Sequence, residues 1–558
     1  MTIMPTISID QTVLRSLIEN RGRVHDIADM AERLPLIGCD IDTCNDEVLD
    51  VEIFPDRPDL LSCETLFHSV MPFLHNAPPM PHLAIRPGTI SMTVDSELEK
   101  IRPVILGAVV RGLEVDEGFI KRLMEHQEKL HFSLGRRRKR SSIGVHDLSK
   151  LSPPFKVVAV PRSHTFIPLA MDEEMSIDQI LAEHPKGVDY AHLLEGMEKV
   201  PIILDSNQEV LSFPPIINGD HTTVSTETRD IFIDVTGWDL RACESSLMLI
   251  CLQLSALGGK VESVRVSGYD SKEWRIDGTP IEHKVERKMM ESILGNQFSD
   301  EEIDNAIKRM GGTYDGEKDG FLYISMPRWR FDILHPIDLV EEIAIGHGYD
   351  DLAHDVPKAP LTAIARSDNN LRRRIREALQ GLGLIQIQSL TLSNDNDQFK
   401  SVRWKPEGKI TRMTNPITTE HTILRQNILP GLFRLLAANR HHDLPQGVYE
   451  LGTVVIDHHN QDRFAFLMAE NSGGFATLRG RIQALMRDLG ATNWSLQPIE
   501  DGPWLSGRSA SIIVEGKVVG QCGEVDPKVS QLFELSVPMS GAQFNISALQ
   551  EVLIDPVH

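Results

Sequence analysis

The stretch Pro327–Asp350, PRWRFDILHPIDLVEEIAIGHGYD, carries the most distinctive pattern in the chain. Its internal proline suits the first turn of a helix, where a backbone N–H would have no partner within the helix. From that start, Asp338, Glu341 and Glu342 fall on one helical face. Asp332 lies just upstream, so four carboxylates converge. A hard cation such as Mg²⁺ would offset their repulsion, but solvated acids that complement the helix dipole are the favoured explanation on spacing alone.

The residues before this stretch predict a helix followed by a hairpin. Ser299 and Glu302 form a capping box, and apolar residues recur at helical spacing up to Gly311, so a helix should run from about residue 300 to 310. The turn-rich DGEKDG at residues 315–320 then separates two short β-type runs. Helix, helix and hairpin together indicate a winged-helix-like module.

Length and composition indicate a multidomain globular protein. The chain has 558 residues, with 57 basic and 80 acidic side chains and a net charge of −23. At about 150 residues per domain, this length predicts three or four domains. A hydrophobic fraction of 41% excludes a disordered or fibrous protein. The acidic balance disfavours broad attraction to nucleic acid or anionic membrane, because its mean field repels phosphates.

The chain has no feature of a secreted or membrane protein. Its first residues have no basic region leading into an apolar stretch, and its longest apolar segment, residues 247–257, is shorter than the about 20 residues that cross a bilayer. The six cysteines contain no C-x-x-C pair, which argues against a zinc site or a disulfide framework. We therefore expect a cytoplasmic protein with no membrane partner.

A second candidate site lies in the strand predicted at residues 231–237, IFIDVTG. Alternating Ile231, Ile233 and Val235 would form its buried face, which puts Asp234 and Thr236 together on the other. The run FPP at residues 213–215 would wall a pocket beside them. From the pattern alone, an edge strand with polar residues facing water is the favoured alternative. No Ser-His-Asp signature is present, so hydrolysis here would depend on positioned water and polar groups.

A run of cations is the third candidate. Residues 136–140 are basic without interruption: Arg136, Arg137, Arg138, Lys139 and Arg140. Such a run is a plausible phosphate contact even on an acidic protein, because screening over about 8–10 Å makes local charge count more than net charge. A solvated loop is an equally good interpretation. A helix predicted from residue 371 also places arginines opposite an apolar stripe, with Arg372 to Arg376 as further cations.

Taken together, four blocks resemble the β subunits of phenylalanine–tRNA ligases of the archaeal and eukaryotic-like type, which are class II aminoacyl-tRNA synthetases. In chain order they are DVEIFPDRPDLLSCETL (50–66), FPPIIN with DIFIDVTG (213–237), the opening stretch, and NPITTEHTILRQNILPGLFRLLAANR (415–440) with VYELG and GRSASI (448–512). The resemblance covers nearly the whole chain.

The resemblance implies an α+β multidomain fold. Proline-rich connectors near residues 80 and 355 and a change of composition near residue 268 divide the chain. We expect a small N-terminal α+β module (1–115), an α/β editing module (116–268), a winged-helix-like, metal-bearing module (269–355) and a class II synthetase-like antiparallel sheet with helices (362–558). Because the last region has no G-x-G-x-[ED]-R motif, it should be a catalytically inactive copy.

The same resemblance implies the activity and the partners. With an α subunit in an (αβ)₂ tetramer, such a chain attaches phenylalanine to tRNA(Phe) and converts ATP to AMP and diphosphate; ATP is therefore a substrate of the assembled enzyme, and the α subunit holds the aminoacylation site. The D-x₅-D-x₂-E-E pattern of the family's Mg²⁺ ligands falls on Asp332, Asp338, Glu341 and Glu342. The ion would be shared with the α subunit.

The family also removes tyrosine attached to the wrong tRNA. The resemblance assigns Asp234 and Thr236 to this editing pocket, and Ser212 and Leu204 less securely because the spacing around them can shift. Two other functions stay open: a non-catalytic RNA-binding scaffold, and a free-standing deacylase that acts on Tyr-tRNA. Requirement for an α subunit separates these alternatives from the ligase.

Overall fold

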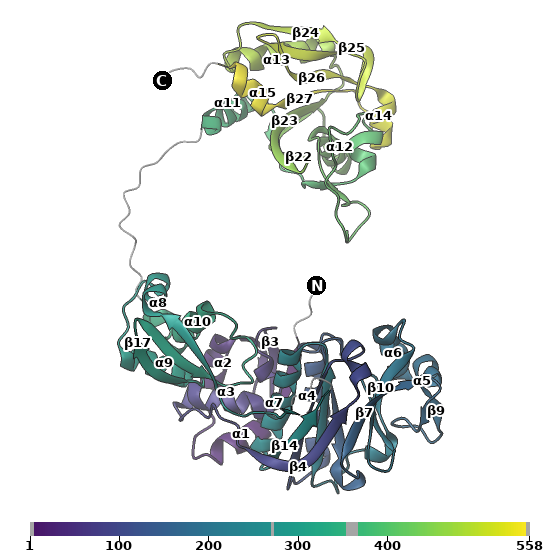
Figure 1. Cartoon of the computed structure of the whole chain (residues 1–558). Helices are drawn as coiled ribbons and strands as arrows, with labels where there is room; N and C mark the ends of the chain where they lie inside the picture. The colour runs from purple at the N-terminus through teal and green to yellow at the C-terminus, as the bar shows by residue number, and fades with distance from the viewer. Residues whose placement is uncertain (1–4, 269–272, 353–366, 554–558) are drawn as a thin grey trace. The chain divides into compact units, whose positions relative to one another are not determined.

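The computed structural model describes residues 5–268, 273–352 and 367–553. The chain forms two compact units, Met1–Pro357 and Lys358–His558, which are described separately (Figure 1). The proline-rich connector at residues 355–360, predicted to mark a boundary, lies outside the described residues. Among the described residues, no helix is both long enough and apolar enough to cross a bilayer.

The first unit begins with a small α+β module. Its three-stranded sheet has the order β1-β3-β2 and is covered by three helices. The elements are β1 (Thr6–Asp10), α1 (Gln11–Glu19), α2 (Ile27–Arg33), β2 (Cys39–Cys44), β3 (Val48–Ile53) and α3 (Cys63–His75). Alternate residues of β3, Leu49, Val51 and Ile53, are buried in the same core cluster as residues of α3, which is itself almost wholly buried.

A ten-stranded sheet forms the centre of this unit. Its order is β12-β11-β10-β7-β4-β14-β5-β13-β6, with β15 (Glu273–Trp274) paired to β14. The other strands are β4 (Ile85–Val94), β5 (Val104–Arg111), β6 (Ser141–Asp147), β7 (Phe155–Pro161), β10 (Lys199–Leu204), β11 (Val210–Phe213), β12 (Ile217–Asn218), β13 (Ile231–Gly237) and β14 (Lys260–Ser267). Strands β4 and β5 belong to this sheet although the sequence analysis placed them in the module of residues 1–115, so the sheet begins soon after the connector near residue 80.

Helices pack against the large sheet, and a further group of short elements lies around its β10–β12 end. Helix α7 (Leu240–Ala256) packs against β5, β13 and β6 and is buried along most of its length. Helix α4 (Glu117–Phe132) contacts α7 and β6 (Figure 1). Around β10 to β12 lie α5 (Ile177–Glu183), α6 (Pro185–Tyr190) and the short pair β8 (Thr165–Phe166) and β9 (Met175–Ser176).

The third part of the unit contains the opening stretch of sequence. It comprises β16 (Ile281–Glu286), α8 (Arg287–Leu294), α9 (Asp300–Arg309), β17 (Thr313–Lys318), β18 (Phe321–Met326) and α10 (Pro336–His347). The predicted capping box, hairpin and helix start at Pro336 are all confirmed. The hairpin strand β18 also pairs with β16, which precedes the two helices. Helix α9 contacts α3 of the N-terminal module.

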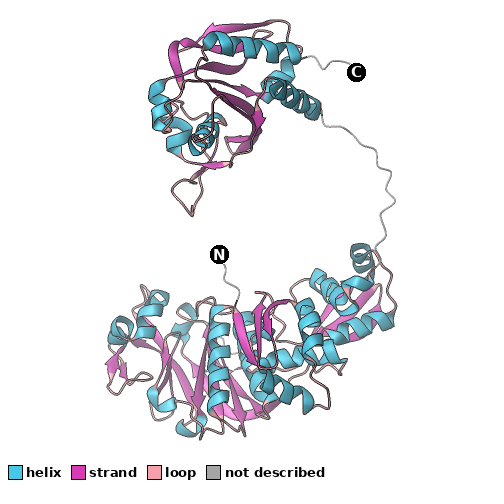
Figure 2. Ribbon diagram, turned by 180° about the vertical axis from the view of Figure 1, so that it is seen from behind, coloured by secondary structure: helices cyan, strands magenta, loops and turns pink. Residues whose placement is uncertain are grey.

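The second unit is built on a seven-stranded sheet of order β19-β22-β23-β27-β26-β25-β24 (Figure 2). Every neighbouring pair is antiparallel except β19 with β22. Its strands are β19 (Ile385–Gln386), β22 (Gln446–Ile456), β23 (His459–Ala469), β24 (Trp494–Pro498), β25 (Trp504–Val514), β26 (Lys517–Val525) and β27 (Met539–Asn545), with the separate pair β20 (Leu392–Ser393) and β21 (Ile423–Leu424). Its helices are α11 (Ser367–Gly381), α12 (Leu429–Ala438), α13 (Phe475–Asp488), α14 (Pro527–Leu532) and α15 (Ile546–Val552).

The apolar stripe predicted on α11 is confirmed, because Leu371, Ile375 and Leu379 lie in the core of this unit. The arginines of that helix do not form one free cationic face. Arg372 forms an ion pair with Asp462, and Arg374 donates to the carbonyl oxygen of Leu489 at 2.5 Å.

Candidate functional site

A cavity of about 270 Å³ lies in the first unit, between α4, β6, the β11–β12 segment and β13. Its wall is largely apolar and includes all three residues of the FPP run, which confirms that they border a pocket: Met124, Ile143, Val145, Phe213, Pro214 and Pro215. Polar side chains interrupt this wall at a few positions: Glu128, Arg138, Ser142, Ser212, Thr222 and Asp234. An apolar cavity with a few placed polar groups is typical of a small-ligand site.

Asp234 lines this cavity from β13, an interior strand of the sheet. Strand β13 lies between β5 and β6, and every one of its residues is buried, so the expectation of an edge strand facing water is wrong. The physical reason is that alternation identified one buried face, while strands distant in sequence cover the other. The Oδ1 atom of Asp234 lies 2.7 Å from Nε2 of His146, and both side chains are almost completely buried.

Thr236 does not line the cavity but supports a residue that does. Its hydroxyl accepts from Nε of Arg102 at 2.7 Å and lies 3.0 Å from the hydroxyl of Ser142. Arg102 also donates to the hydroxyl of Ser142 at 2.9 Å. Burial lowers the pKa of Arg102 to about 10. Arg102 therefore holds two hydroxyl groups, of which only that of Ser142 borders the cavity.

The other two predicted pocket residues also separate. Ser212 lines the cavity, and its hydroxyl donates to Oδ1 of Asn218 at 3.5 Å. Leu204 is not among the lining residues; it packs in the neighbouring apolar cluster with Phe213 and Ile217. The expected set is thus represented at the cavity by Asp234 and Ser212.

The side chains of the cationic run at residues 136–140 differ in their environment. Arg138 is buried at the cavity, where it donates to Oε1 of Glu128 at 2.6 Å and to the carbonyl oxygen of Ile216 at 2.8 Å. Arg140 forms an ion pair with Asp239. Arg136, Arg137 and Lys139 are exposed.

Three successive residues of that loop, Arg136, Arg137 and Arg138, have φ between 45° and 64°. This left-handed region costs a residue with a side chain roughly 1–2 kcal/mol, and such strain collects at functional sites. The surrounding contacts of Arg138 hold the loop in this conformation. The exposed cations Arg136, Arg137 and Lys139 therefore lie on either side of Arg138, which lines the cavity.

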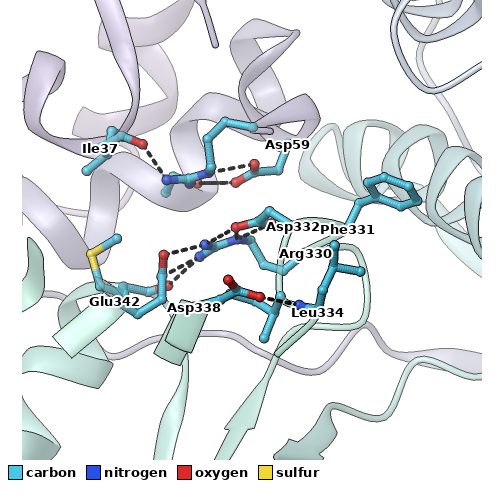
Figure 3. A network of polar contacts seen from close by, with 12 residues as sticks. Ile37, Asp59, Arg330, Phe331, Asp332, Leu334, Asp338 and Glu342 are labelled. Carbon is cyan, nitrogen blue, oxygen red and sulfur yellow. Dashed lines mark hydrogen bonds and ion pairs between the residues drawn. The ribbon is translucent and has the colours of Figure 1, made fainter. Parts of the chain in front are cut away.

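Three of the four carboxylates of the opening stretch, Asp332, Asp338 and Glu342, are divided between different partners (Figure 3). Asp332 and Glu342 both bind the guanidinium of Arg330: its Nε lies 2.9 Å from Oδ1 of Asp332 and its Nη2 lies 2.6 Å from Oε1 of Glu342. Asp338 instead accepts from the backbone N–H groups of Leu334 at 2.6 Å and His335 at 2.7 Å.

A second buried ion pair, in the N-terminal module, lies close enough for its charges to act on this cluster. Arg57 binds Asp59 through Nε at 2.9 Å and Nη2 at 2.8 Å, and its Nη1 donates to the carbonyl oxygen of Ile37. Burial raises the pKa of Glu342, against the pull of Arg330. Burial also opposes ionisation of Asp59, but Arg57 holds the pKa of that carboxyl below its usual value. The site therefore contains two groups of ion pairs, one in each module, whose charges influence each other.

The donor chemistry of the four carboxylates suits Mg²⁺, but their arrangement does not form a complete site within this chain. Among the described residues, no three histidine, cysteine or acidic side chains come together in a group that could hold a metal ion. Arg330 already neutralises Asp332 and Glu342, and Glu341 is exposed. The predicted convergence of all four carboxylates on one point is not found.

Sequence reasoning missed two residues that line the cavity, Ser142 and Thr222, and two that support it from behind, His146 and Arg102. His146 follows the alternation of β6, SSIGVHD, and a histidine in a buried strand is a signal that could have been found. Arg102 lies in no recognisable pattern, and only the tertiary structure brings it to Thr236.

Comparison with known proteins finds matches along most of the chain. Three family models match: the B3/4 domain at residues 117–252, the tRNA synthetase B5 domain at 283–349, and the "Phenylalanyl tRNA synthetase beta chain CLM domain" at 352–546. The B3/4 match contains the residues of β13 and β6, and the B5 match contains the carboxylate cluster.

Full-length relatives and a solved structure extend this similarity. The phenylalanine–tRNA ligase β subunit of Archaeoglobus fulgidus is 39% identical, over 92% of this chain and 94% of that protein. The β subunit of Methanococcoides burtonii is 37% identical, over 98% of this chain and 100% of its own. An N-terminal fragment of the phenylalanyl-tRNA synthetase β subunit from Pyrococcus horikoshii is 32% identical with a TM-score of 0.58, over 62% of this chain and 100% of that fragment. Because these similarities run through nearly the whole length, the chain belongs to the phenylalanine–tRNA ligase β-subunit family.

Proposed function

We propose that this chain works in the cytoplasm with an α subunit, as an (αβ)₂ tetramer, to convert ATP, L-phenylalanine and tRNA(Phe) into AMP, diphosphate and Phe-tRNA(Phe). The observation that carries this proposal is the similarity to β subunits along almost the entire chain. The seven-stranded, mostly antiparallel sheet of the second unit supports a class II-like core. Since that region lacks the ATP-binding motif, the α subunit would supply the aminoacylation site.

The second part of the proposal is that the cavity removes tyrosine from mischarged tRNA. An apolar pocket built for phenylalanine rejects an isostere with one added hydroxyl only about 10²-fold, and protein synthesis needs on the order of 10⁴. A second pocket with polar groups can select what the first one admits. The cavity offers that combination, because Asp234 and Ser142 are among a few polar groups in a largely apolar wall.

The chemistry of this step follows from the cavity. A water molecule attacks the ester carbonyl carbon, the bond to the terminal ribose oxygen breaks, and that oxygen receives a proton. The Asp234 carboxylate would accept a hydrogen bond from the substrate's amino group or phenolic hydroxyl, and Ser142 would donate one. We assign Asp234 to recognition, with Thr236 acting through Ser142 and Leu204 shaping the wall from behind.

We further propose that Arg136, Arg137 and Lys139 contact the tRNA, with Arg138 as the anchor of their loop. Support comes from their exposure around a residue that lines the cavity. The end of an aminoacyl-tRNA must bring its phosphates to the pocket mouth, where exposed cations attract them.

A shared Mg²⁺ ion stays a proposal for the carboxylate cluster. Asp332, Asp338, Glu341 and Glu342 remain its proposed ligands, and the α subunit would have to complete the site. When bound, the ion would neutralise carboxylate charge at the interface. Within this chain, Arg330 supplies that neutralisation to Asp332 and Glu342.

Coexpression with a candidate α subunit tests the proposed function. The complex should have the mass of a tetramer and should catalyse phenylalanine-dependent ATP–diphosphate exchange and charging of tRNA(Phe), whereas the isolated chain should do neither. Exchange by the isolated chain would refute the inactive core. An isolated chain that hydrolyses Tyr-tRNA and binds no α subunit would instead support the free-standing deacylase, and binding of tRNA without either activity would support a scaffold.

A further inference from the structure

The two carboxylate oxygens of Asp234 have different surroundings. Oδ1 lies 2.7 Å from Nε2 of His146. Among the described residues, no hydrogen-bond partner reaches Oδ2, although the side chain borders the cavity. When the Asp234 carboxylate is ionised it only accepts hydrogen bonds, and Nε2 of His146 is then the donor. This contact fixes the orientation of the carboxylate and leaves Oδ2 available to a ligand.

His146 is itself fixed on its other side. Its Nδ1 lies 2.9 Å from Oγ1 of Thr222, whose hydroxyl also reaches the carbonyl oxygen of Gly219 at 3.0 Å. Whether that hydroxyl proton points to Nδ1 or to Gly219, Nε2 remains the donor to Asp234. The imidazole is fully buried and stacks on Phe232, with ring centroids 5.8 Å apart. The ring therefore has little freedom to turn away.

The strand opposite Asp234 is shaped to leave room for this contact. Gly144 of β6 pairs directly with Asp234 of β13. A Cβ atom added at Gly144 would lie 2.2 Å from Oδ1 of Asp234 and 2.8 Å from Nε2 of His146. Any side chain at this position would push the two groups apart.

We propose that His146 is the positioning residue of the pocket, holding Asp234 so that Oδ2 faces the amino group or phenolic hydroxyl of an aminoacyl ester. This inference rests on the proposed editing function. The order Thr222, His146, Asp234 resembles a hydrolase triad, in which the carboxylate lies behind the histidine. Here Asp234 lines the cavity and His146 does not, so the histidine acts through the carboxylate.

The test uses the αβ complex and preformed Tyr-tRNA(Phe), with kcat and KM for tyrosine release measured separately. His146→Ala should lower kcat/KM about 10²-fold, as misplacing a binding group by about 1 Å does. His146→Gln keeps an N–H donor at the end of the side chain and should stay within about threefold of the wild type. Charging with phenylalanine should stay unchanged in both variants, which shows that the complex is intact. If His146→Ala releases tyrosine like the wild type, or His146→Gln is as impaired as His146→Ala, the positioning role is wrong.

Two further variants test whether the contact between His146 and Asp234, rather than the presence of the imidazole ring alone, is needed. Gly144→Ala retains the imidazole but should lose activity to the same extent as His146→Ala; full activity would contradict the inference. His221→Ala, which removes a partly exposed histidine next to Thr222, is the matched control and should have no effect. Failure of the proposed function is distinguishable, because then neither the wild-type complex nor any variant would release tyrosine.

Discussion

Buried polar side chains around the cavity are arranged in pairs that only the folded chain brings together. The hydroxyls of Ser142 and Thr236 both accept from Arg102, and they lie 3.0 Å from each other. Either hydroxyl can donate to the other. When Thr236 is the donor, the proton of Ser142 can point to the carbonyl oxygen of Thr236, 3.4 Å away, or into the cavity.

This coupling predicts that Ser142→Ala and Thr236→Val impair the same function. Each single substitution should lower hydrolysis of Tyr-tRNA by the αβ complex several-fold, and the double variant should be no worse than the more impaired single variant, because residues in one network are not additive. A double-mutant cycle on deacylation rates measures this. Fully additive losses would mean that Thr236 acts independently of Ser142.

Acid should destabilise the first unit through its buried histidines. Burial lowers the pKa of His131 to about 4, from an ordinary value near 6.5. The unfolded chain therefore takes up this proton first, so the contribution to stability is complete above pH 6.5 and is lost as the pH falls from 6.5 to 4. At about 1.4 kcal/mol per pKa unit, the loss at pH 5 is about 2 kcal/mol.

The variant His131→Gln removes this proton uptake while keeping an acceptor for the N–H of Ile143, which donates to His131 at 2.8 Å. Urea unfolding at pH 7 and pH 5 should show a difference between the two pH values that is about 2 kcal/mol smaller than in the wild type. An unchanged difference would show that His131 does not drive the acid sensitivity.

At the scale of secondary-structure elements, the sequence predicts a feature well when the interacting residues are close together in the chain, and poorly when they are far apart. The helix α9 with its capping box, the β17–β18 hairpin and the start of α10 at Pro336 are specified by neighbours within a few residues, and all three were predicted. The burial of both faces of β13 was not, because Phe155 and Val264, which help cover its second face, lie far away in sequence. The identity of the pocket residues came from the family resemblance and not from their spacing.

The carboxylate cluster shows the same limit. Spacing placed Glu341 and Glu342 side by side, but one is exposed and the other is buried against Arg330. Arg330 is only two residues from Asp332, yet nothing in the sequence indicated that it would turn inward between two carboxylates. Removing Glu342 therefore disturbs a buried ion pair whether or not a metal is bound.

Arg330→Ala should destabilise the first unit by about 3–5 kcal/mol, because it leaves Asp332 and Glu342 as buried charges without their partner. Glu341→Ala should change stability by no more than about 0.5 kcal/mol. Chemical unfolding of the isolated chain compares the two. If Arg330→Ala is as mild as Glu341→Ala, the ion-pair network does not stabilise the junction of the modules. Glu341 takes no part in the ion pairs of Arg330, so Glu341→Ala is the appropriate variant for measuring how the loss of a proposed ligand changes the metal content of the αβ complex.

At the scale of the whole molecule, the charge of −23 and the proposed tRNA partner have to be reconciled. The isolated chain should bind tRNA weakly, and its affinity should fall steeply with salt, while the complex should bind well. Replacing Arg136, Arg137 and Lys139 together by alanine should flatten the plot of log affinity against log salt by about 2 to 3 units, since each of the three phosphate contacts contributes slightly less than one. Binding titrations at several salt concentrations measure this slope. An unchanged slope would show that the loop of residues 136–139 does not contact the phosphates of tRNA.

The central claim is that the cavity of the first unit edits tRNA while the α subunit does the charging. Its most direct test is the rate at which the coexpressed αβ complex carrying Asp234→Ala releases tyrosine from preformed Tyr-tRNA(Phe), compared with the wild-type complex. We expect release to fall at least tenfold while charging with phenylalanine stays within about twofold, because Asp234 would bind only the editing substrate. Release of tyrosine at the wild-type rate by the Asp234→Ala complex would contradict the account.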